Sequence, residues 1–462
     1  MTSAAPTANN HTTGSLQHAL HFFSKHPHVM FIHYHWTDMS GVLRVRVVPK
    51  AHSLKLASEN RPFKAGAFSL IGLMSSTSLP NSFRPGSVSS LWPDWISIRI
   101  LRHTHASVFC DVSEEAASHT DIDYTNPFQR CPRSVLKNVL FTAKAEHQLS
   151  FLAGFELEFY LMNDEDFKHA LADDAPKSAN CWSTASGMRD PRGKCLEECV
   201  VALQEADIEV EQFHAEPGRH MYEISTGPLP VLAAVDTWNQ SLEIVKYTAV
   251  KCGFQATFLP KPFGTLYCLG QHVHLSLHPE SRTGDETKDI NDSFLAGILH
   301  RLPLLCGYGM PCQDSFRRLE PLALAGWVSW GTENRDAPLR KIKEGHWELR
   351  TIDGTANFYL VLAAFITAGL LGIQEKEPLK WKDNRNFLSR LDGEAREELG
   401  INTPLPASLE EAMALCKSDL MGLDSMLGKQ ILEFYTMVKD GEQLNLAKMT
   451  EKEKKEIYLN NF

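Results

Sequence analysis

Residues 154–160 read Gly-Phe-Glu-Leu-Glu-Phe-Tyr, an apolar, strand-like run that contains two carboxylates. The two-residue period of a β-strand places Glu156 and Glu158 on the same face. Two like charges on one face of a buried strand are costly unless a cation compensates them. The alternative is an edge strand with a solvated acidic face, which the flanking Phe155, Phe159 and Tyr160 disfavour.

A second acidic pair lies in residues 214–223, which read His-Ala-Glu-Pro-Gly-Arg-His-Met-Tyr-Glu. Glu216 and Glu223 flank a Pro-Gly turn that can fold both carboxylates toward one point. Glutamate pairs are common in loops, so this pair indicates a site only in combination with other elements.

Residues 272–276 read His-Val-His-Leu-Ser, and strand alternation places His272, His274 and Ser276 on one face. Histidine is the commonest side-chain ligand of borderline divalent metals, and carboxylates suit Mg²⁺ or Mn²⁺. The alternative for each histidine is a core residue whose hydrogen bonds are satisfied within the protein.

Arginines accompany this pattern in the second half of the chain: Arg317, Arg318, Arg335, Arg340 and Arg350. Glu348 and Arg350 share a strand face by the two-residue period. Arginine binds carboxylate and phosphate in a bidentate manner, although any single one of these residues can equally be a surface arginine. Together, the carboxylates and histidines predict a divalent-metal cage, and the arginines predict an anionic substrate beside it.

The composition limits the class of partner. The chain has 462 residues, a net charge of -10 and a sequence pI of about 6.1. This balance disfavours a nucleic acid or an anionic membrane as partner, because phosphate binding needs a basic field. It leaves ATP binding open, since a few arginines and divalent cations supply local positive charge. The pattern GxxxxGK[ST] is missing from the sequence, so a nucleotide site would not be a P-loop.

The sequence also predicts a cytoplasmic location. The N-terminus has no basic region followed by an apolar one, so no signal peptide is expected. The apolar run from Tyr359 to Ile373 is shorter than the roughly 20 residues of a membrane span and is expected to be a buried core helix. Ten cysteines without a CxxC pair are expected to be mostly buried free thiols.

Three parts are expected along the chain: a disordered tail at residues 1–14, a small β-rich domain at 15–112, and a larger domain at 125–462. In the small domain, residues 29–36 and 42–48 predict a hairpin, and residues 95–101 and 106–112 predict further strands. The larger domain alternates strands with helices, which are expected at residues 135–146, 238–252, 289–305 and 357–374.

The ordered motifs resemble those of the glutamine synthetase family. The family pattern GxExEF matches residues 154–159, its paired glutamates match Glu216 and Glu223, and HxHxS matches 272–276. Its arginine motif spans residues 318–335, and ExRxxDxxANxYL matches residues 348–360. Trp36-Thr-Asp-Met-Ser-Gly-Val-Leu-Arg44, Trp92-Pro-Asp94 and Pro260-Lys-Pro262 agree as well. The resemblance covers residues 15–462, and residues 330–335 with 345–350 are most similar to the fungal branch associated with the developmental protein FluG.

The resemblance implies an α+β fold with a small N-terminal β-grasp domain and a large catalytic domain built on a curved antiparallel sheet. It implies one Mg²⁺ or Mn²⁺ site at Glu158, Glu216 and Glu223, and another at Glu156, His272 and Glu348. It places ATP contacts at His274, Ser276, Arg335 and Arg340, of which the two arginines are also expected to be catalytic, and substrate contacts at Gly270, Arg318 and Arg350. It further implies a double-ring homo-oligomer with active sites between subunits.

Three departures from the family pattern concern the substrate pockets. Residues 219–222 read Arg-His-Met-Tyr before the second glutamate, where the family usually has Pro-Gly-Gln. Cys268 stands where the family has a glycine that lines the amino-acid pocket. Residues 321–326 contain no acid, although ammonia-using members carry a glutamate there.

The resemblance implies an ATP-dependent ligase that activates glutamate or a related acid as an acyl phosphate and joins it to ammonia or an organic amine. ATP is then a cosubstrate, and the other partners are small molecules. Two alternatives remain: a catalytically silent relative that acts as a scaffold or developmental signalling protein, and a metal hydrolase that uses the glutamate and histidine cluster. The arginine-rich second half is poorly explained by a hydrolase.

Overall fold

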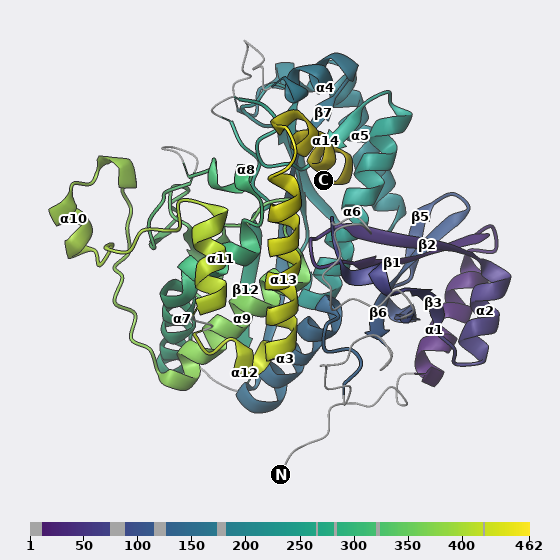
Figure 1. The fold of residues 1–462 in the computed structure, drawn as a ribbon, viewed down its shortest axis with the longest axis horizontal. Helices are drawn as coiled ribbons and strands as arrows, with labels where there is room; N and C mark the ends of the chain where they lie inside the picture. Colours follow the sequence, from purple (N-terminus) through teal and green to yellow (C-terminus); the bar gives the residue numbers. More distant parts are fainter. Residues whose placement is uncertain are drawn as a thin grey trace.

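The computed structural model describes residues 12–73, 88–114, 126–172, 182–264, 267–280, 284–319, 324–418 and 421–462. Its described residues form two β-sheets, one in the N-terminal part and one in the larger C-terminal part, with helices packed against both (Figure 1). The fold is mixed α+β, as the sequence predicts.

The N-terminal sheet has six strands in the order β2-β1-β6-β4-β3, and β5 pairs with β6. The strands are β1 (Phe31–Thr37), β2 (Leu43–Pro49), β3 (Phe63–Gly66), β4 (Val88–Pro93), β5 (Arg99–Arg102) and β6 (His105–Glu114). Strands β1 and β2 form the expected antiparallel hairpin. The Asp38 carboxylate shapes the connecting turn because it accepts hydrogen bonds from the backbone N–H groups of Ser40 and Val42. Helices α1 (Thr12–Lys25) and α2 (Lys50–Ser58) complete this part.

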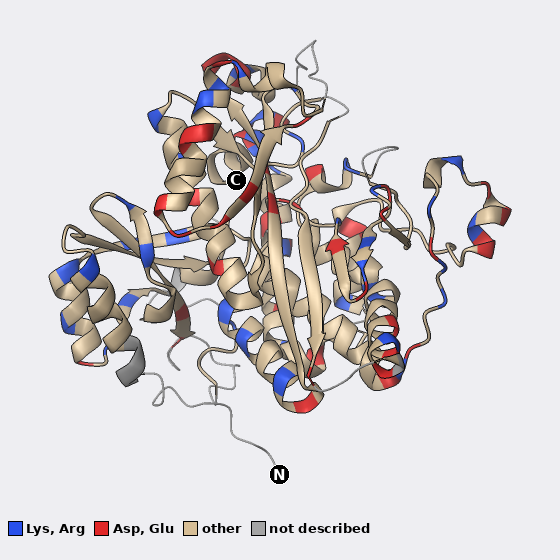
Figure 2. Ribbon diagram, turned by 180° about the vertical axis from the view of Figure 1, so that it is seen from behind, with Lys and Arg blue, Asp and Glu red and all other residues tan. Residues whose placement is uncertain are grey.

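The larger sheet has nine strands in the order β13-β14-β15-β12-β7-β9-β8, and β10 and β11 also pair with β7. The strands are β7 (Leu149–Met162), β8 (Val210–Ala215), β9 (Met221–Thr226), β10 (Leu229–Pro230), β11 (Gln255–Thr257), β12 (Val273–Pro279), β13 (Trp330–Thr332), β14 (Leu339–Lys343) and β15 (His346–Leu349). All pairings in this sheet are antiparallel except β13 with β14. The long strand β7 connects the two halves of the sheet, and Figure 2 shows acidic positions in the middle of the long strands.

The helices of the larger part are α3 (Pro132–His147), α4 (Asp164–Leu171), α5 (Pro191–Glu205), α6 (Val231–Lys251), α7 (Asp285–Gly309), α8 (Gln313–Phe316), α9 (Phe358–Glu375), α10 (Gly393–Glu398), α11 (Leu409–Ser418), α12 (Asp424–Leu427), α13 (Lys429–Leu446) and α14 (Glu451–Asn461). Helix α9 is long and apolar enough to cross a membrane by length and composition, but 83% of it is buried inside the protein. It packs closely on α7, because a Cβ atom on Gly297 would lie 2.7 Å from the Cα atom of Gly372. The structure therefore uses α9 as a core helix.

An ionic network joins the two parts of the chain. Arg133, near the start of α3, donates hydrogen bonds to Asp94 after β4, to Asp111 of β6 and to Asp236 of α6. The Tyr359 hydroxyl donates to the same Asp236 carboxylate. Since Arg133 is buried, these carboxylates hold its charge in place and tie the N-terminal sheet to the larger part.

The structure follows most of the predicted elements but corrects one. The predicted strand at residues 95–101 begins instead with a 3₁₀ turn at Trp95–Ser97, whose N-cap Asp94 accepts a hydrogen bond from the Ile96 N–H, and β5 starts at Arg99. Of the predicted tail, residues 1–11 lie outside the described residues and Thr12 begins α1. The domain limits at residues 112 and 125 stay predictions. The nine described cysteines are all free thiols, as expected.

Candidate active site

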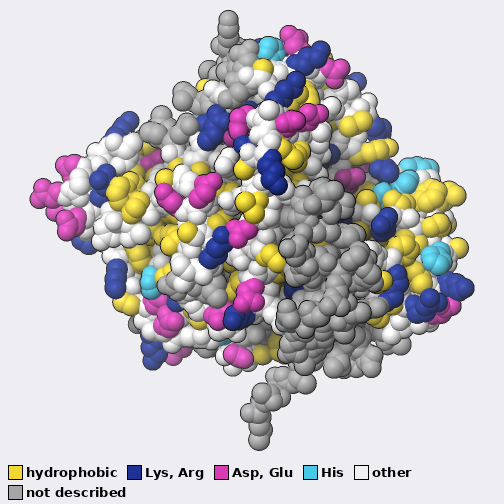
Figure 3. All heavy atoms as spheres, viewed as in Figure 1, with side chains coloured by type: hydrophobic (Ala, Val, Ile, Leu, Met, Phe, Trp, Pro, Cys, Tyr) yellow, Lys and Arg dark blue, Asp and Glu magenta, His cyan; other side chains and the backbone are white. Residues whose placement is uncertain are grey.

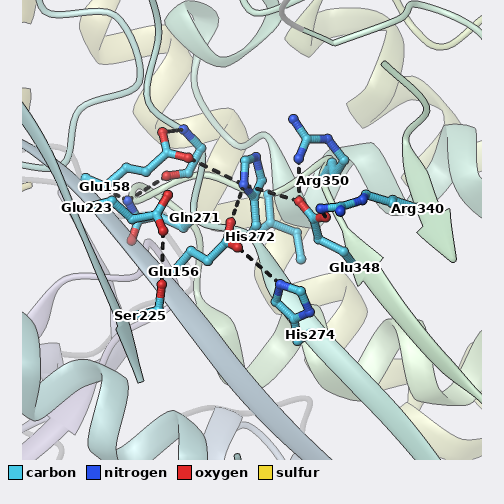
Figure 4. Close-up of polar contacts among 12 residues, drawn as sticks. Glu156, Glu158, Glu223, Ser225, Gln271, His272, His274, Arg340, Glu348 and Arg350 are labelled. Atoms are coloured by element: carbon cyan, nitrogen blue, oxygen red, sulfur yellow. Dashed lines mark hydrogen bonds and ion pairs between the residues drawn. The ribbon is translucent and has the colours of Figure 1, made fainter. Parts of the chain in front are cut away.

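Four strands of the larger sheet bring an acidic cluster together. Glu156 and Glu158 lie on β7, and Glu223 of β9 lies directly opposite Glu158 in the strand register. On the other side of β7, Glu348 of β15 lies opposite His274 of β12. Figure 4 shows that these side chains converge on one region, although Glu156 and Glu348 lie 192 residues apart in the sequence.

The first group of possible metal ligands contains Glu156, His272 and Glu348, whose ligand atoms all lie within 4.8 Å of one another. His272 Nδ1 lies 2.8 Å from a Glu156 oxygen and 3.4 Å from a Glu348 oxygen. The family resemblance predicts this same set as one metal site, and the structure places the three side chains side by side. Their role as ligands stays a prediction.

The second predicted set, Glu158, Glu216 and Glu223, is arranged around Glu223. Glu223 forms one close group with Glu156 and Glu158, and another with Glu216 and His214, each within 4.8 Å. His214 Nδ1 lies 3.4 Å from a Glu216 oxygen, and Nε2 lies 3.7 Å from a Glu223 oxygen. The turn between Glu216 and Glu223 thus returns both carboxylates to one point, as the Pro-Gly sequence predicts.

The acidic cluster carries more negative charge than its neighbours neutralise. Burial and the nearby Glu216 and Glu223 raise the pKa of Glu158 well above its usual range. Burial together with Glu156 and Glu216 raises the pKa of Glu223 to about 8. Burial also raises the pKa of Glu216, although His214 opposes that shift. The surroundings of these three carboxyl groups thus oppose their ionisation, and a bound cation would offset that opposition.

On the other side of the cluster, neighbouring histidines and arginines balance the negative charges of Glu156 and Glu348. Burial alone would raise the pKa of Glu156, but hydrogen bonds from His272 and His274 hold it well below its usual range. Glu348 is fully buried, and its charge is balanced by ion pairs with Arg350 and, at 2.9 Å, with Arg340. Burial alone would raise the pKa of Glu348, but the charge of Arg350, with His272 and His274, lowers it to about 2.

The donor set fits a divalent cation with a preference for oxygen ligands. Carboxylate oxygens dominate the cluster, with one or two imidazole nitrogens, which matches Mg²⁺ or Mn²⁺. The raised pKa values of Glu158, Glu216 and Glu223 indicate an electrostatic deficit that such a cation would fill.

The predicted nucleotide contacts extend outward from the cluster along β12. His274 Nε2 donates a hydrogen bond to a Glu156 oxygen at 3.1 Å, and His274 Nδ1 lies 3.1 Å from Nε2 of His346 on β15. Ser276 lies two residues farther along, opposite His346 in the register, and its hydroxyl contacts His278 at 2.9 Å. These side chains form a polar surface on the same strand face as the cluster.

The two arginines expected to be catalytic differ in their surroundings. Arg340 pairs with Glu348 and with the exposed Glu333. Arg335 is exposed, and its guanidinium carbon lies 5.5 Å from the centre of the Trp182 ring. Arg340 is therefore held by carboxylates, whereas Arg335 is held by an aromatic face.

The predicted substrate contacts lie on the inner side of the cluster. The Gly270 N–H donates to Glu158 at 2.8 Å, and a Cβ atom at this position would lie 2.4 Å from His272 Nε2, so a glycine fits there. Arg318 is buried, and its terminal nitrogens donate to the carbonyls of Arg350 and Ile352 at 2.9 and 3.0 Å. Arg318 thus forms part of the pocket wall, and its predicted contact with a substrate carboxylate stays a prediction.

A model of the glutamine synthetase catalytic domain matches residues 129–458 of the chain, which include every strand of the larger sheet. The chain belongs to the glutamine synthetase family. Membership of this family explains why the two glutamate pairs, the histidine motif and the arginine-rich segment occur in one chain and converge in one cluster.

Among curated proteins, the chain is 35% identical over 328 residues to protein fluG of Emericella nidulans, a match that covers 70% of this chain and 37% of that protein. It is 26% identical over 426 residues to gamma-glutamylpolyamine synthetase GlnA3 of Streptomyces coelicolor, with 88% of each chain covered. It is 30% identical over 380 residues to glutamine synthetase of Methanocaldococcus jannaschii, with 76% and 78% covered. The chain therefore spans about a third of the length of fluG and most of the length of the other two.

Solved structures share the fold. The structure described as apo GmaS without ligand matches with a TM-score of 0.76, 24% identity, and coverage of 93% of this chain and 96% of that one. A GmaS complex with ADP matches with a TM-score of 0.77, 23% identity, and coverage of 95% and 99%. The mixed α+β architecture of the family is thus present, with the N-terminal β-grasp-like sheet beside the catalytic domain.

Several residues at the site escaped the sequence prediction. His214 joins the group of Glu216 and Glu223, His346 contacts His274, and Trp182 contacts both Glu216 and Arg335. His214 and His346 stand within two residues of predicted ligands, so their positions were a usable signal. Trp182 is 34 residues from Glu216 in a segment without strand or helix periodicity, and only the fold brings the two together.

Proposed function

We propose that this chain is an ATP-dependent ligase that joins the carboxylate of glutamate, or of a related acid, to an amine. The observation that carries the proposal is the combination of an undercompensated carboxylate cluster with an arginine beside it that has no ion pair among the described residues. The carboxylates at Glu158, Glu216 and Glu223 need cations, and Arg335 offers a guanidinium to an anion. Cation sites beside a free anion-binding group are what transfer of a phosphoryl group requires.

A carboxylate is a poor electrophile, and transfer of the γ-phosphoryl group of ATP converts it to an acyl phosphate that an amine can attack. The predicted ligands for Mg²⁺ or Mn²⁺ are Glu156, Glu158, Glu216, Glu223, His272 and Glu348, and bound cations would neutralise phosphate charge. His274 and Ser276 would contact the nucleotide from β12. Arg335 and Arg340 would stabilise the charge on the transferring group.

The acid would lie against the wall formed by Gly270, Arg318 and Arg350. Burial raises the pKa of the neighbouring Cys268 thiol, an effect that Arg318 opposes, so a neutral side chain occupies the position of the family's pocket glycine. This extra side chain favours an acid that differs from glutamate or binds in a shifted position. Arg350 and Arg318 are both buried and keep their positions through contacts with Glu348 and with backbone carbonyls.

The amine is proposed to be an organic amine rather than ammonia. The segment at residues 321–326, which is expected to carry the ammonium-binding glutamate, contains no glutamate. Residues 321–323 of this segment lie outside the described part of the chain, and Leu324 is buried. The relative from Streptomyces coelicolor, whose name describes gamma-glutamylpolyamine synthesis, supports this direction. Two further expectations stay predictions: the cytoplasmic location, which the sequence predicts, and the double-ring homo-oligomer, which the family resemblance implies. On the face seen in Figure 3, basic and acidic side chains are interspersed, which agrees with small-molecule partners.

A catalytically silent relative is the second candidate. Cys268 and the backbone-bound Arg318 favour it, since both restrict the acid pocket. Buried carboxylates that bind no cation would only destabilise the protein, and this cost favours the ligase over the silent relative.

The test measures ATP-dependent phosphate release with Mg²⁺ or Mn²⁺, first with glutamate and ammonia and then with a panel of organic amines. Release that requires both an acid and an organic amine supports the ligase and identifies its substrates. Glu216→Ala should abolish release, whereas Glu165→Gln, which removes an exposed acid on α4, should leave it unchanged. Equal rates with ammonia and with every organic amine would refute the organic-amine assignment. Binding of metal and nucleotide without release for any pair would favour the silent relative.

A further inference from the structure

Trp182 makes three contacts at the edge of the acidic cluster although 55% of its surface is exposed. Its indole Nε1 donates a hydrogen bond to a Glu216 oxygen at 3.1 Å. Its ring stands edge-to-face against His214, with a centroid separation of 6.3 Å and an interplanar angle of 84°. Its face carries the guanidinium of Arg335. One exposed aromatic side chain thus touches two members of a ligand group and one arginine.

Arg335 differs from the other arginines of the site. Arg340 and Arg350 are paired with carboxylates, and Arg318 donates to two carbonyls. Among the described residues, the guanidinium of Arg335 has no hydrogen bond or ion pair, and its direct contact is the Trp182 ring. It still lies close enough to the cluster to lower the pKa of Glu216 and Glu223 against their burial. The ring is therefore what fixes a long side chain that would otherwise explore many rotamers.

We propose that Trp182 is a positioning residue that holds the Arg335 guanidinium and the Glu216 carboxylate in place for an incoming metal–nucleotide complex. The catalytic consequence of this role rests on the proposed ligase function, whereas its effect on binding does not. An arginine stacked on an aromatic face is oriented before the anion arrives, so less side-chain entropy is lost on binding. A hydrogen-bond donor behind a ligating carboxylate likewise fixes the orientation of the ligand oxygen.

The two parts of this role can be separated by substitution. Trp182→Phe keeps an aromatic face for Arg335 and removes the N–H donor to Glu216. Trp182→Leu removes both. Tyr247→Leu is the matched control, because Tyr247 on α6 is an exposed aromatic that carries Arg102 at 4.2 Å and lies outside the cluster. Because Trp182 and Tyr247 are both exposed, all three variants should fold, which thermal unfolding verifies.

The experiment measures two affinities of the full chain without turnover: that for Mn²⁺ alone, and that for a nonhydrolysable ATP analogue at saturating Mn²⁺. Trp182→Phe should weaken Mn²⁺ binding about tenfold through the loss of the donor to Glu216 and leave the analogue affinity unchanged. Trp182→Leu should weaken Mn²⁺ binding equally and, in addition, weaken analogue binding about threefold to tenfold. Tyr247→Leu should change neither affinity.

A double-mutant cycle with Arg335→Ala connects the aromatic face to the arginine. If Trp182 acts through Arg335, the loss of analogue affinity in Trp182→Leu should disappear in the Arg335→Ala background. The positioning role would be overturned if the losses of analogue affinity in Trp182→Leu and Arg335→Ala were additive. It would also be overturned if Trp182→Leu bound the analogue as tightly as the unsubstituted protein, or if the unsubstituted protein did not bind the analogue at all. Failure of the ligase function would appear differently: no phosphate release with any acid and amine, while the Mn²⁺ and analogue cycle keeps its predicted pattern.

Discussion

Glu158 and Glu223 lie directly opposite each other on neighbouring antiparallel strands, and both are buried. Like charges directly opposite in a sheet destabilise it, and burial increases the cost. Burial is the largest cause of the raised pKa of both carboxyl groups, and neighbouring carboxylates add to it: Glu216 and Glu223 at Glu158, and Glu156 and Glu216 at Glu223. Because the strand pairing holds these two buried carboxylates together, the fold itself favours the binding of a divalent cation between them.

The first prediction concerns the stability cost of this pair. Glu158→Gln replaces a carboxyl group whose pKa is raised on folding with a neutral amide, so the folded protein no longer bears the cost of keeping that carboxyl group buried, and the free energy of unfolding in EDTA at neutral pH should rise by about 1–3 kcal/mol. The same variant should lose the stabilisation that Mn²⁺ gives to the unsubstituted protein. Denaturant unfolding with EDTA and with Mn²⁺ measures both effects. A lower stability in EDTA and an undiminished Mn²⁺ effect would show that the pair is not a cation site.

The second prediction uses the close packing at Gly270. Gly270→Ala pushes a Cβ atom against His272 Nε2, so the imidazole must turn away from Glu156 and Glu348. Because the imidazole is the end of a side chain, we expect a stability cost of only about 1 kcal/mol. Mn²⁺ affinity should fall about tenfold through the misplaced histidine. Gly393→Ala is the control, since a Cβ atom there meets nothing within 4 Å; equal effects of the two substitutions would contradict the prediction.

The third prediction concerns the ionic network between the two parts of the chain. Arg133→Met keeps the apolar stem and removes the guanidinium that pairs with Asp94 and Asp236, which should cost about 3–5 kcal/mol of unfolding free energy. Among the described residues, Asp236 would keep only the Tyr359 hydroxyl as a partner, and Asp94 would keep Lys137 at 3.4 Å. Arg61→Met removes an exposed ion pair with Glu59 and should cost less than about 0.5 kcal/mol. Unfolding followed separately by fluorescence and by circular dichroism measures the loss. Similar costs for both variants would mean that the buried network does not hold the parts together.

The fourth prediction is a pH dependence that originates in the N-terminal sheet. Burial, with Arg102 and His105 nearby, lowers the pKa of His33 to about 4, and burial beside His33 and Arg102 lowers that of His35 to about 3. Both folded-state values lie below the unfolded value of 6.5, so the unfolded chain binds more protons between these limits. The stability contribution is therefore complete above pH 6.5 and is lost as the pH falls toward 4.

Each histidine should contribute a slope of about 1.4 kcal/mol per pH unit within this window. His35→Leu removes one titrating group, so its unfolding free energy should fall less steeply than that of the unsubstituted protein between pH 6.5 and 5. His103→Gln replaces an exposed histidine and should leave the slope unchanged. Parallel curves for His35→Leu and the unsubstituted protein would refute the assignment.

Much of the site was predictable from local patterns. The two-residue period placed Glu156 beside Glu158 and His272 beside His274, and the Pro-Gly turn returned Glu216 to Glu223. The structure confirms these neighbourhoods, because each depends on geometry within one or two strands. The α+β class came from the family resemblance, because alternating strand and helix patterns alone equally indicate a parallel α/β sheet.

The remainder depended on contacts between distant segments. Nothing local links Arg133 to Asp236, or Trp182 to Arg335, since these pairs meet through the packing of separate elements. Arg335 and Arg340 looked equivalent in the sequence, and only their partners distinguish them. The 3₁₀ turn at Trp95 arose from a side-chain cap by Asp94 that competes with the strand propensity of the segment.

Transfer of an oxygen atom tests the central claim most directly. If an acyl phosphate forms, a carboxylate oxygen of the acid bonds to phosphorus and leaves with the phosphate when the amine attacks the carbonyl carbon. With glutamate or the accepted acid labelled with ¹⁸O in its reacting carboxylate, the account predicts one ¹⁸O atom in each phosphate released in the presence of amine. Phosphate that carries oxygen from water and none from the acid would contradict the account and indicate hydrolysis at the metal cluster.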